Sequence, residues 1–216
     1  MQSAGVEAAS HGGRAKGMSR KQAALRREEI LAATVEEIEA SGLRTLRVAD
    51  VAARLGLSPS LVIYHFATKE ALVAEAFAHA GESDLSRARR IAASSRPARE
   101  KLDEVIAWYM PAGSTRSWKI WIDGWSAGLF DTELRSTFAA LDREWKAILA
   151  SLIEAGRDAG EFAAGTDSAQ AIATRTLAYL DGLAIQATFH PEEVSRALMG
   201  EWAQSFLERE LLPSRT

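Results

Sequence analysis

Apolar side chains recur at helical spacing along most of the chain. The first such stretch begins at about Gln22 and is stopped by Ser41 and Gly42, a pair typical of helix ends. Its apolar positions are Ile30, Leu31, Thr34, Val35 and Ile38. Because this spacing places the side chains on one face of a helix, the stretch predicts an amphipathic α-helix.

Three further helices are predicted in quick succession. A short helix spans residues 48–55 and is closed by Gly56. Ser58 and Pro59 then predict an N-cap and a first-turn proline for a third helix, which reaches about residue 65. Thr68 is placed to cap a fourth helix that runs to about residue 80 or beyond.

The remainder of the chain predicts longer helices separated by short breaks. We expect these breaks at Pro97, at residues 111–114, 130–131 and 160–167, and at Pro191. Strand-like alternation between turn signals is absent, with residues 118–123 as the one possible exception. We predict an all-α protein with an irregular, disordered tail at 1–20, a three-helix unit at 21–67 and a larger helical body at 68–212.

Composition excludes several classes of protein. The 216 residues, 47% of them hydrophobic, are enough to bury a substantial core. No apolar run is long enough to span a bilayer or to form a signal peptide, so we expect a cytoplasmic protein without membrane contact. The chain has no cysteine, its four histidines lack metal-site spacing, and no nucleotide-binding glycine motif occurs. We therefore expect no metal and no cofactor.

Charge is distributed unevenly along the chain. The net charge of −3 by itself argues against nucleic-acid binding. Residues 1–27, however, carry six basic side chains and only one acidic one, Glu7, whereas residues 76–216 carry 16 basic and 20 acidic side chains. A basic end on an acidic body favours contact with an anion at that end only.

The second and third predicted helices have the spacing of a helix-turn-helix. Gly56 permits the turn between them, and the small Ala52 lets the helices cross closely. If the third helix lies in a major groove, its exposed side chains reach phosphate oxygens, base edges and thymine methyl groups. The candidate DNA contacts are Arg47, Ser58, Ser60, Leu61, Ile63, Tyr64, His65 and Lys69.

Several of these residues also have a purely structural interpretation. Tyr64 and Phe66 are placed to pack where the third and fourth helices meet, and for Phe66 we favour packing. His65 could instead cap a helix end, and Arg47 could be a solvated charge. For Tyr64, Ser60 and Lys69 we favour DNA contact.

Three runs of sequence between Arg27 and Phe77 together form one recognisable pattern. They are Ile30-Leu31-Ala32-Ala33, then Val51-Ala52-Ala53-Arg54-Leu55-Gly56-Leu57-Ser58-Pro59, then Tyr64-His65-Phe66-Ala67-Thr68-Lys69-Glu70-Ala71-Leu72. This segment resembles the DNA-binding domain of TetR-type repressors. The most specific motif of that family in this segment is the Tyr-His-Phe turn followed by Lys-Glu-x-Leu. The sequence departs from the family pattern at two positions, and both bear on which operator sequence is bound. Arg47 stands where the family commonly has Thr or Ser as a helix cap, a role that Thr45 could take instead. Ile63 stands where the family often has an aromatic residue.

The body carries a looser resemblance. The relevant residues are Trp118-Lys119-Ile120-Trp121, Trp145, Gly156, Gly160-Glu161-Phe162 and Asp181-Gly182-Leu183-Ala184. They resemble the ligand-binding domain of the BetI-like branch of the family. The resemblance implies a homodimeric repressor that binds a double-stranded DNA operator and is released when a small-molecule effector moves the two DNA-binding heads apart.

Tryptophan is concentrated in one part of the body, where five of the six lie between Trp108 and Trp145. Spacings of three and four place several of them on one helix face, a pattern more often found in a core than around a ligand. So many flat rings also suit an apolar effector chamber, and a nearby carboxylate would favour a cationic ligand unless it points to solvent. The candidate pocket residues are Trp108, Trp118, Trp121, Asp123, Trp125, Phe138, Trp145 and Tyr179.

Residues 168–190 and 192–210 predict a pair of amphipathic helices at the end of the chain. The small residues Gly182 and Gly200 permit close approach, so two such pairs are expected to form a four-helix homodimer interface. The alternative is that the helices pack only on their own body. The predicted interface residues are Ile172, Leu177, Leu180, Leu183, Ala184, Ala187, Val194, Leu198, Trp202 and Phe206.

One motif favours an enzyme. Gly124-Trp125-Ser126-Ala127-Gly128 matches the G-x-S-x-G elbow of serine hydrolases, and Asp181 and His190 follow in the order of that catalytic triad. The elbow requires a strand at residues 118–123 and a parallel sheet beneath it, for which no other segment supplies strands. We therefore expect a regulator without enzymatic activity.

Overall fold

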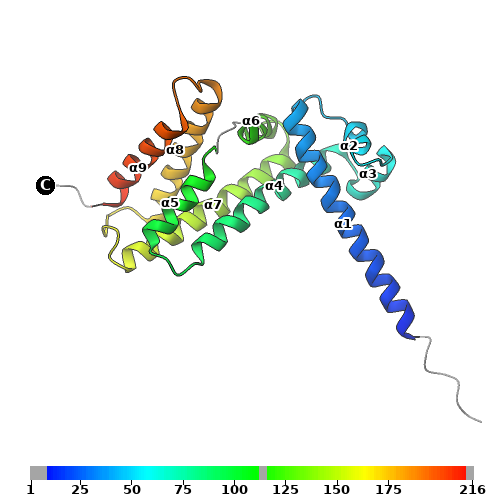
Figure 1. Cartoon of the computed structure of the whole chain (residues 1–216), viewed down its shortest axis with the longest axis horizontal. Helices are drawn as coiled ribbons and strands as arrows, with labels where there is room; N and C mark the ends of the chain where they lie inside the picture. Colours follow the sequence, from blue (N-terminus) through cyan, green and yellow to red (C-terminus); the bar gives the residue numbers. More distant parts are fainter. Residues whose placement is uncertain (1–8, 112–115, 213–216) are drawn as a thin grey trace, which may run out of the picture.

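The computed structural model describes residues 9–111 and 116–212, and over these ranges all regular structure is helical (Figure 1). This confirms the all-α prediction, and no described helix is long and apolar enough to cross a membrane. The helices are α1 (Ala9–Ser41), α2 (Val48–Arg54), α3 (Pro59–Phe66), α4 (Lys69–Ala92), α5 (Ala98–Tyr109), α6 (Arg116–Gly128), α7 (Thr132–Asp158), α8 (Ala169–Phe189) and α9 (Arg196–Leu211).

Helices α2 and α3 pack against α1 and the beginning of α4 at one end of the molecule (Figure 1). The Ser58 hydroxyl caps α3 by accepting a hydrogen bond from the Leu61 N–H at 3.3 Å, and Pro59 occupies the first helical position, as predicted. Thr68 caps α4 in the same way. The shared apolar core of this unit contains Ile30, Val51, Val62, Phe66, Leu72 and Phe77.

The first helix begins earlier than the sequence pattern predicts. The prediction of an irregular tail over residues 1–20 is wrong for residues 9–20, which continue α1 towards the N-terminus; residues 1–8 lie outside the described part of the chain. Three glycines, at 12, 13 and 17, interrupt the apolar periodicity. Extending an existing helix needs no new nucleation, so the well-anchored part of α1 can carry this stretch. The extension projects away from the body in Figure 1.

A strained turn joins α3 to α4. Ala67 has φ 65° and ψ −51°, and the Thr68 N–H donates to the Phe66 carbonyl at 2.8 Å across it. This is a γ-turn with positive φ, which is rare for a residue with a Cβ and costs on the order of 1–3 kcal/mol. The turn reverses the chain within one residue, so that α4 packs back on α1.

Helix α7 is the centre of the body and packs against α4, α5, α6 and α8. The breaks predicted at Pro97, 130–131, 160–167 and Pro191 are confirmed, whereas the one at 111–114 lies, apart from residue 111, outside the described residues. Pro97 precedes α5, and the Asp131 carboxylate caps α7 by accepting from the Leu134 N–H at 2.9 Å. Gly156 lets the ring of Phe162 lie directly on α7, since a Cβ at this position would be 2.2 Å from that ring.

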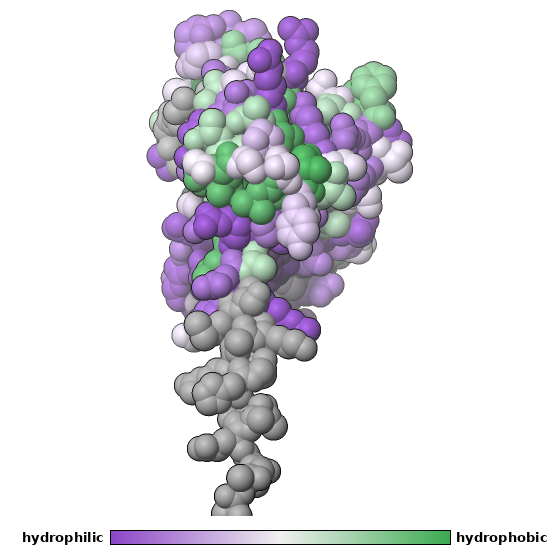
Figure 2. Space-filling view, turned by 90° about the vertical axis from the view of Figure 1, so that its right-hand side faces the viewer, coloured by the Kyte–Doolittle hydropathy of each residue, from purple (hydrophilic) through white to green (hydrophobic). Residues whose placement is uncertain are grey.

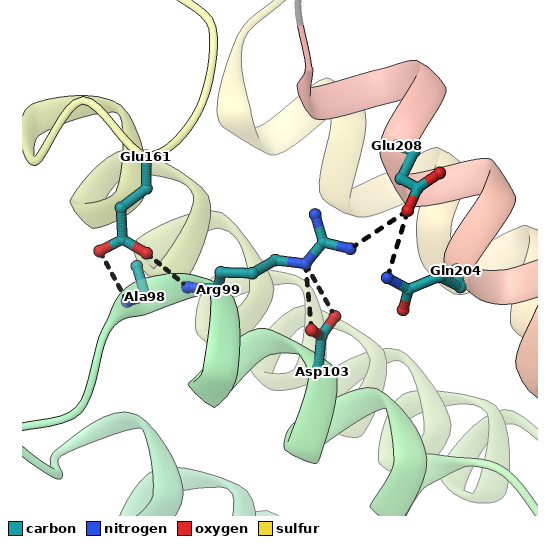
Figure 3. Close-up of polar contacts among 6 residues, drawn as sticks. All are labelled: Ala98, Arg99, Asp103, Glu161, Gln204 and Glu208. Atoms are coloured by element: carbon teal, nitrogen blue, oxygen red, sulfur yellow. Dashed lines mark hydrogen bonds and ion pairs between the residues drawn. The ribbon is translucent and has the colours of Figure 1, made fainter.

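A polar cluster fixes the beginning of α5 (Figure 3). Glu161, from the loop after α7, accepts hydrogen bonds from the backbone N–H groups of Ala98 and Arg99, each at 2.9 Å. These bonds lower the pKa of Glu161. Arg99 in turn donates to Asp103 and lies 4.0 Å from Glu208 on α9. Because α5 has no side-chain cap of its own, Glu161 supplies one from a distant loop and ties α5 to α7 and α9.

The predicted interface residues of α8 are buried within their own subunit. Ile172, Leu177, Leu180, Leu183, Ala184 and Ala187 all belong to the core. For these residues the prediction of a dimer surface is wrong and the alternative holds, because they are the face of α8 that packs against the body; Val194 on the second segment is buried as well. The outer face of the α8–α9 pair instead exposes Phe189 and Trp202, and a Cβ at Gly182 or Gly200 would meet nothing within 4 Å.

Candidate functional site

The surface of α3 is divided between buried and exposed side chains. Val62 and Phe66 are buried, which confirms the packing interpretation for Phe66. On the other face the Tyr64 side chain is 82% exposed, and Leu61 is 38% exposed. Figure 2 looks onto this end of the molecule and shows hydrophobic groups surrounded by hydrophilic ones.

The predicted DNA contacts all come from the N-terminus of α2, from α3 and its N-cap, and from the first residue of α4. None of the eight is buried: Arg47, Ser58, Ser60, Leu61, Ile63, Tyr64, His65 and Lys69. Arg47 is the N-cap residue of α2 but makes no capping hydrogen bond. Thr45 does not replace it, because its hydroxyl donates back to the Ser41 carbonyl at 2.5 Å. Ser58 and Ser60 lie 3.0 Å apart, oxygen to oxygen.

Arg27, which the sequence did not single out, holds α3 in place. Its guanidinium lies over the Phe66 ring, 4.2 Å from the centroid, and donates to the His65 carbonyl at the end of α3. The same group forms an ion pair with Glu75 on α4. One side chain of α1 therefore fixes the direction of α3, the predicted recognition helix, relative to both α1 and α4.

The body contains a cavity of about 510 Å³, a volume typical of small-molecule sites. Helices α4 to α8 supply its walls. Six predicted pocket residues line it: Trp108, Trp118, Trp121, Trp125, Phe138 and Trp145. The lining also includes residues that the sequence analysis missed, among them Asp84, Tyr109, Arg135, Asp142 and Asp181.

The aromatic rings of the cavity stand roughly perpendicular to one another. Tyr109 meets Trp145 at a centroid distance of 4.8 Å and Trp118 at 5.5 Å, and Trp118 meets Trp125 at 6.0 Å. The interplanar angles range from 72° to 78°, so each contact is edge to face. These rings and their contacts form one aromatic wall of the cavity, which we call the aromatic box.

Carboxylates are the principal charged groups of this aromatic cavity. Asp181 on α8 accepts a hydrogen bond from the Tyr109 hydroxyl. Burial raises the pKa of Asp181 to about 6, against the opposing effect of that hydrogen bond, and burial likewise raises the pKa of Asp84 to about 6. Burial and the charge of Asp181 raise the pKa of Tyr109 well above its usual value, so the phenol remains neutral. Asp142 forms an ion pair with Lys146 at 2.7 Å.

Two predicted pocket residues lie elsewhere. The Asp123 carboxylate neither lines the cavity nor points to solvent; it accepts a hydrogen bond from the Leu43 N–H at 2.5 Å, in the turn between α1 and α2. Asp123 is off the tryptophan face of α6, and that other face meets the DNA-binding unit. Tyr179 stacks on Phe206 at 4.5 Å and 11°, in the contact between α8 and α9.

Helix α6 therefore contacts the cavity and the N-terminal unit at once. Its tryptophans line the cavity, whereas Ile120 belongs to the core of the N-terminal unit. Trp121 joins the two, since its ring lies 5.7 Å from that of Phe77. The helix is held tightly here, because a Cβ at Gly124 would lie 2.6 Å from both Phe77 and Phe138.

The hydrolase motif has no catalytic geometry. Residues 124–128 form the end of α6, so Ser126 lies on a helix and not on a strand–turn–helix elbow. Asp181 is bonded to Tyr109, and His190 ends α8 at the surface. No group of acidic residues and histidines in the described ranges is arranged to hold a metal ion.

An exposed recognition helix on a small unit, joined to a helical body with an aromatic cavity, defines a DNA-binding regulator that responds to a ligand. Residues 30–76 match the tetR family of bacterial regulatory proteins, and residues 98–212 match the C-terminal domain of BetI-type transcriptional repressors. The chain belongs to the TetR family, as its sequence predicts, and is a ligand-responsive DNA-binding transcriptional repressor. No curated protein matches its sequence significantly.

Solved structures share this fold over nearly their whole length. A transcriptional regulator from Saccharomonospora viridis in complex with choline is 24% identical, with a TM-score of 0.79 over 88% of this chain and 99% of its own. A TetR regulator from Haloarcula marismortui is 19% identical, with a TM-score of 0.76 over 87% and 99%. FadR from Bacillus subtilis, in complex with stearoyl-CoA, is 20% identical, with a TM-score of 0.65 over 83% and 95%.

Replacing Arg27 tests whether it orients the recognition helix. We expect Arg27→Ala to lower the free energy of unfolding by about 1–3 kcal/mol, because it removes a cation–π contact, a hydrogen bond and an ion pair together. Arg26→Ala is the matched control: Arg26 forms only an exposed ion pair with Glu29, so its loss should cost less than about 0.5 kcal/mol. Chemical denaturation measures both. Equal effects would contradict the assignment.

Proposed function

We propose that this protein represses transcription as a cytoplasmic homodimer and leaves its operator when a small organic cation enters the cavity. The observation that carries the proposal is the combination of aromatic walls with partly buried carboxylates in a body that shares a helix with the DNA-binding unit. We assign no catalytic activity to it.

The dimer follows from the spacing of DNA grooves. Two recognition helices read successive major grooves on one face of DNA when they are roughly 34–36 Å apart, which one subunit cannot achieve. The outer face of α8 and α9 offers Phe189 and Trp202 beside the glycines at 182 and 200, where a second backbone has room to approach. An isologous four-helix contact would cover both aromatic residues.

The cationic ligand follows from the chemistry of the cavity. Indole and phenol faces attract quaternary ammonium groups, and a buried carboxylate adds direct charge attraction. The choline complex of the Saccharomonospora regulator supports the same ligand class for this chain. The FadR complex with stearoyl-CoA supports a different class, but an anionic ligand would meet Asp84 and Asp181 as like charges.

Helix α6 supplies the connection between the ligand and the DNA. A cation that moves the tryptophan face of α6 also moves Asp123, on which the turn after α1 depends for a hydrogen bond. Because packed interiors deform little, the displacement reaches the DNA-binding unit.

Tyr64→Ala tests the recognition helix. We expect specific binding to operator DNA to fall at least about tenfold, because the exposed ring supplies base or phosphate contacts, while stability changes by less than about 0.5 kcal/mol. Footprinting on the DNA upstream of the protein's own gene and its neighbours, at two salt concentrations, finds the operator; fluorescence anisotropy then measures the affinity. Phe130→Ala, which removes an exposed aromatic side chain from the turn between α6 and α7, is the control. Wild-type affinity of Tyr64→Ala would contradict the assignment.

Asp123→Ala tests the connection through α6. We expect the variant to bind choline within about twofold of wild type, because Asp123 lies outside the cavity. In the wild type, operator DNA weakens choline binding by a certain factor, and we expect this coupling factor to be several-fold smaller in the variant. The measurement is choline affinity with and without operator, and operator affinity with and without choline, which must agree by reciprocity. Glu133→Ala, exposed in the first turn of α7, is the control. An unchanged coupling factor would overturn this route.

Choline titration against pH tests the ligand class. Choline keeps its charge at all pH values, so any pH dependence reports on the protein. Because the carboxyl of Asp181, beside the aromatic rings, titrates at a pKa of about 6, choline affinity should be highest above pH 7 and fall about tenfold by pH 5 as this group becomes protonated. The Tyr109 phenol stays neutral throughout; Asp142, its partner Lys146 and Arg135 are the other charged groups at the cavity.

Quenching of tryptophan fluorescence measures this affinity. Asp181→Asn should weaken choline binding and flatten its pH profile, whereas Asp158→Asn, at the far end of α7, should change neither. Saturable quenching by stearoyl-CoA but not by choline would contradict the cationic assignment.

A further inference from the structure

Two carboxylates of the cavity, Asp84 and Asp181, form no salt bridge within the described parts of the chain. The nearby cations have other partners. Lys146 pairs with Asp142, although its charge also acts on Asp181; Arg135 donates to the carbonyls of Gly128 and Leu129; and Arg87 lies over the Trp108 ring at 3.8 Å. Two negative charges of the cavity wall therefore remain for a ligand.

These two carboxylates come from different helices of the cavity wall. Asp84 belongs to α4 and Asp181 to α8, and both helices pack on α7 (Figure 1). The pKa of Tyr109 is raised by burial first and then by the charges of Asp181, Asp142 and Asp84, so both carboxylates act on the same phenol. Asp84 and Asp181 are therefore two negative poles of one cavity, supplied by two helices.

A ligand with one cationic group leaves one of these poles uncompensated. Taking a carboxylate out of water without a partner is costly, and a monocation seated in the aromatic box beside Asp181 does not remove that cost at Asp84. Choline, with a single charge, is also small for a cavity of about 510 Å³. Both observations favour a longer molecule with a positive group at each end.

We propose that the ligand of this cavity is an organic dication, with one cationic group held by the aromatic box beside Asp181 and the other beside Asp84. The proposal rests on the proposed function, since it assumes that the cavity binds cations. Burial raises the pKa of both carboxyls to about 6, so a dication that ionises both should release more protons on binding near pH 6 than a monocation does.

The test compares choline with two bis-quaternary probes, in which trimethylammonium groups are joined by a four-carbon or a six-carbon chain. All three keep their charges at every pH. Tryptophan quenching gives their affinities for the full-length protein and for Asp84→Asn and Asp181→Asn. Glu82→Gln is the matched control, since Glu82 lies two residues from Asp84 on α4 but is exposed and pairs with Arg89.

We expect at least one dication to bind about tenfold or more tightly than choline, as a second buried charge pair allows. Asp84→Asn should remove that advantage and leave choline within about twofold, Asp181→Asn should weaken all three probes, and Glu82→Gln should weaken none. The inference is overturned if neither dication exceeds choline, or if Asp84→Asn weakens choline as much as the dications. If no probe binds, the cationic ligand class itself is wrong.

Discussion

Helix α6 has to fit two cores at once, and the rest of the molecule is arranged around that requirement. Its backbone at Gly124 lies so close to the rings of Phe77 and Phe138 that no side chain fits there. Trp121 contacts the same two rings, 5.7 Å and 6.2 Å away, while other tryptophans of the helix enclose the cavity. A helix so tightly packed cannot yield on one face without moving the other, because protein interiors are nearly incompressible. Ligand contact and DNA-binding geometry are thus properties of one rigid element.

The carboxylates of the cavity are partly removed from water, and the packing around them does not compensate for the lost hydration of their charges. Burial raises the pKa of Asp84 and Asp181 to about 6, so near neutral pH the empty protein holds two poorly solvated negative charges. The proposed cation would offset that loss, and a ligand that binds only the folded state also stabilises the fold by mass action. The aromatic rings and the carboxylates therefore act together: the rings exclude water, and the exclusion of water strengthens every charge interaction inside.

Local signals in the sequence predicted the fold well because caps and prolines act within one turn. Ser58 and Asp131 cap the helices that follow them, and Pro97 precedes the first residue of α5. Helical spacing also predicted the tryptophan face of α6, since facing follows from periodicity. Periodicity does not say which element covers the opposite face of α6. The sequence therefore placed Asp123 in the cavity, whereas in the structure its carboxylate accepts a hydrogen bond from the Leu43 N–H. Asp84 and Asp181 were missed because an acidic residue on an amphipathic helix looks like an ordinary solvated one until tertiary packing buries it.

Helix α4 provides a second connection between the cavity and the DNA-binding unit. It carries Asp84 in the cavity wall and, nine residues earlier and about 14 Å along the helix, Glu75, the partner of Arg27. The two routes meet at α1, because Arg27 lies on it and Leu43, which bonds to Asp123, follows it directly. In the proposed mechanism Asp84 acts through α4 and the tryptophans act through α6, so a ligand that reaches both would act on α1 and the turn after it at two points. We expect such a ligand to move the recognition helix as a rigid body, since Arg27 contacts α3 and α4 from α1.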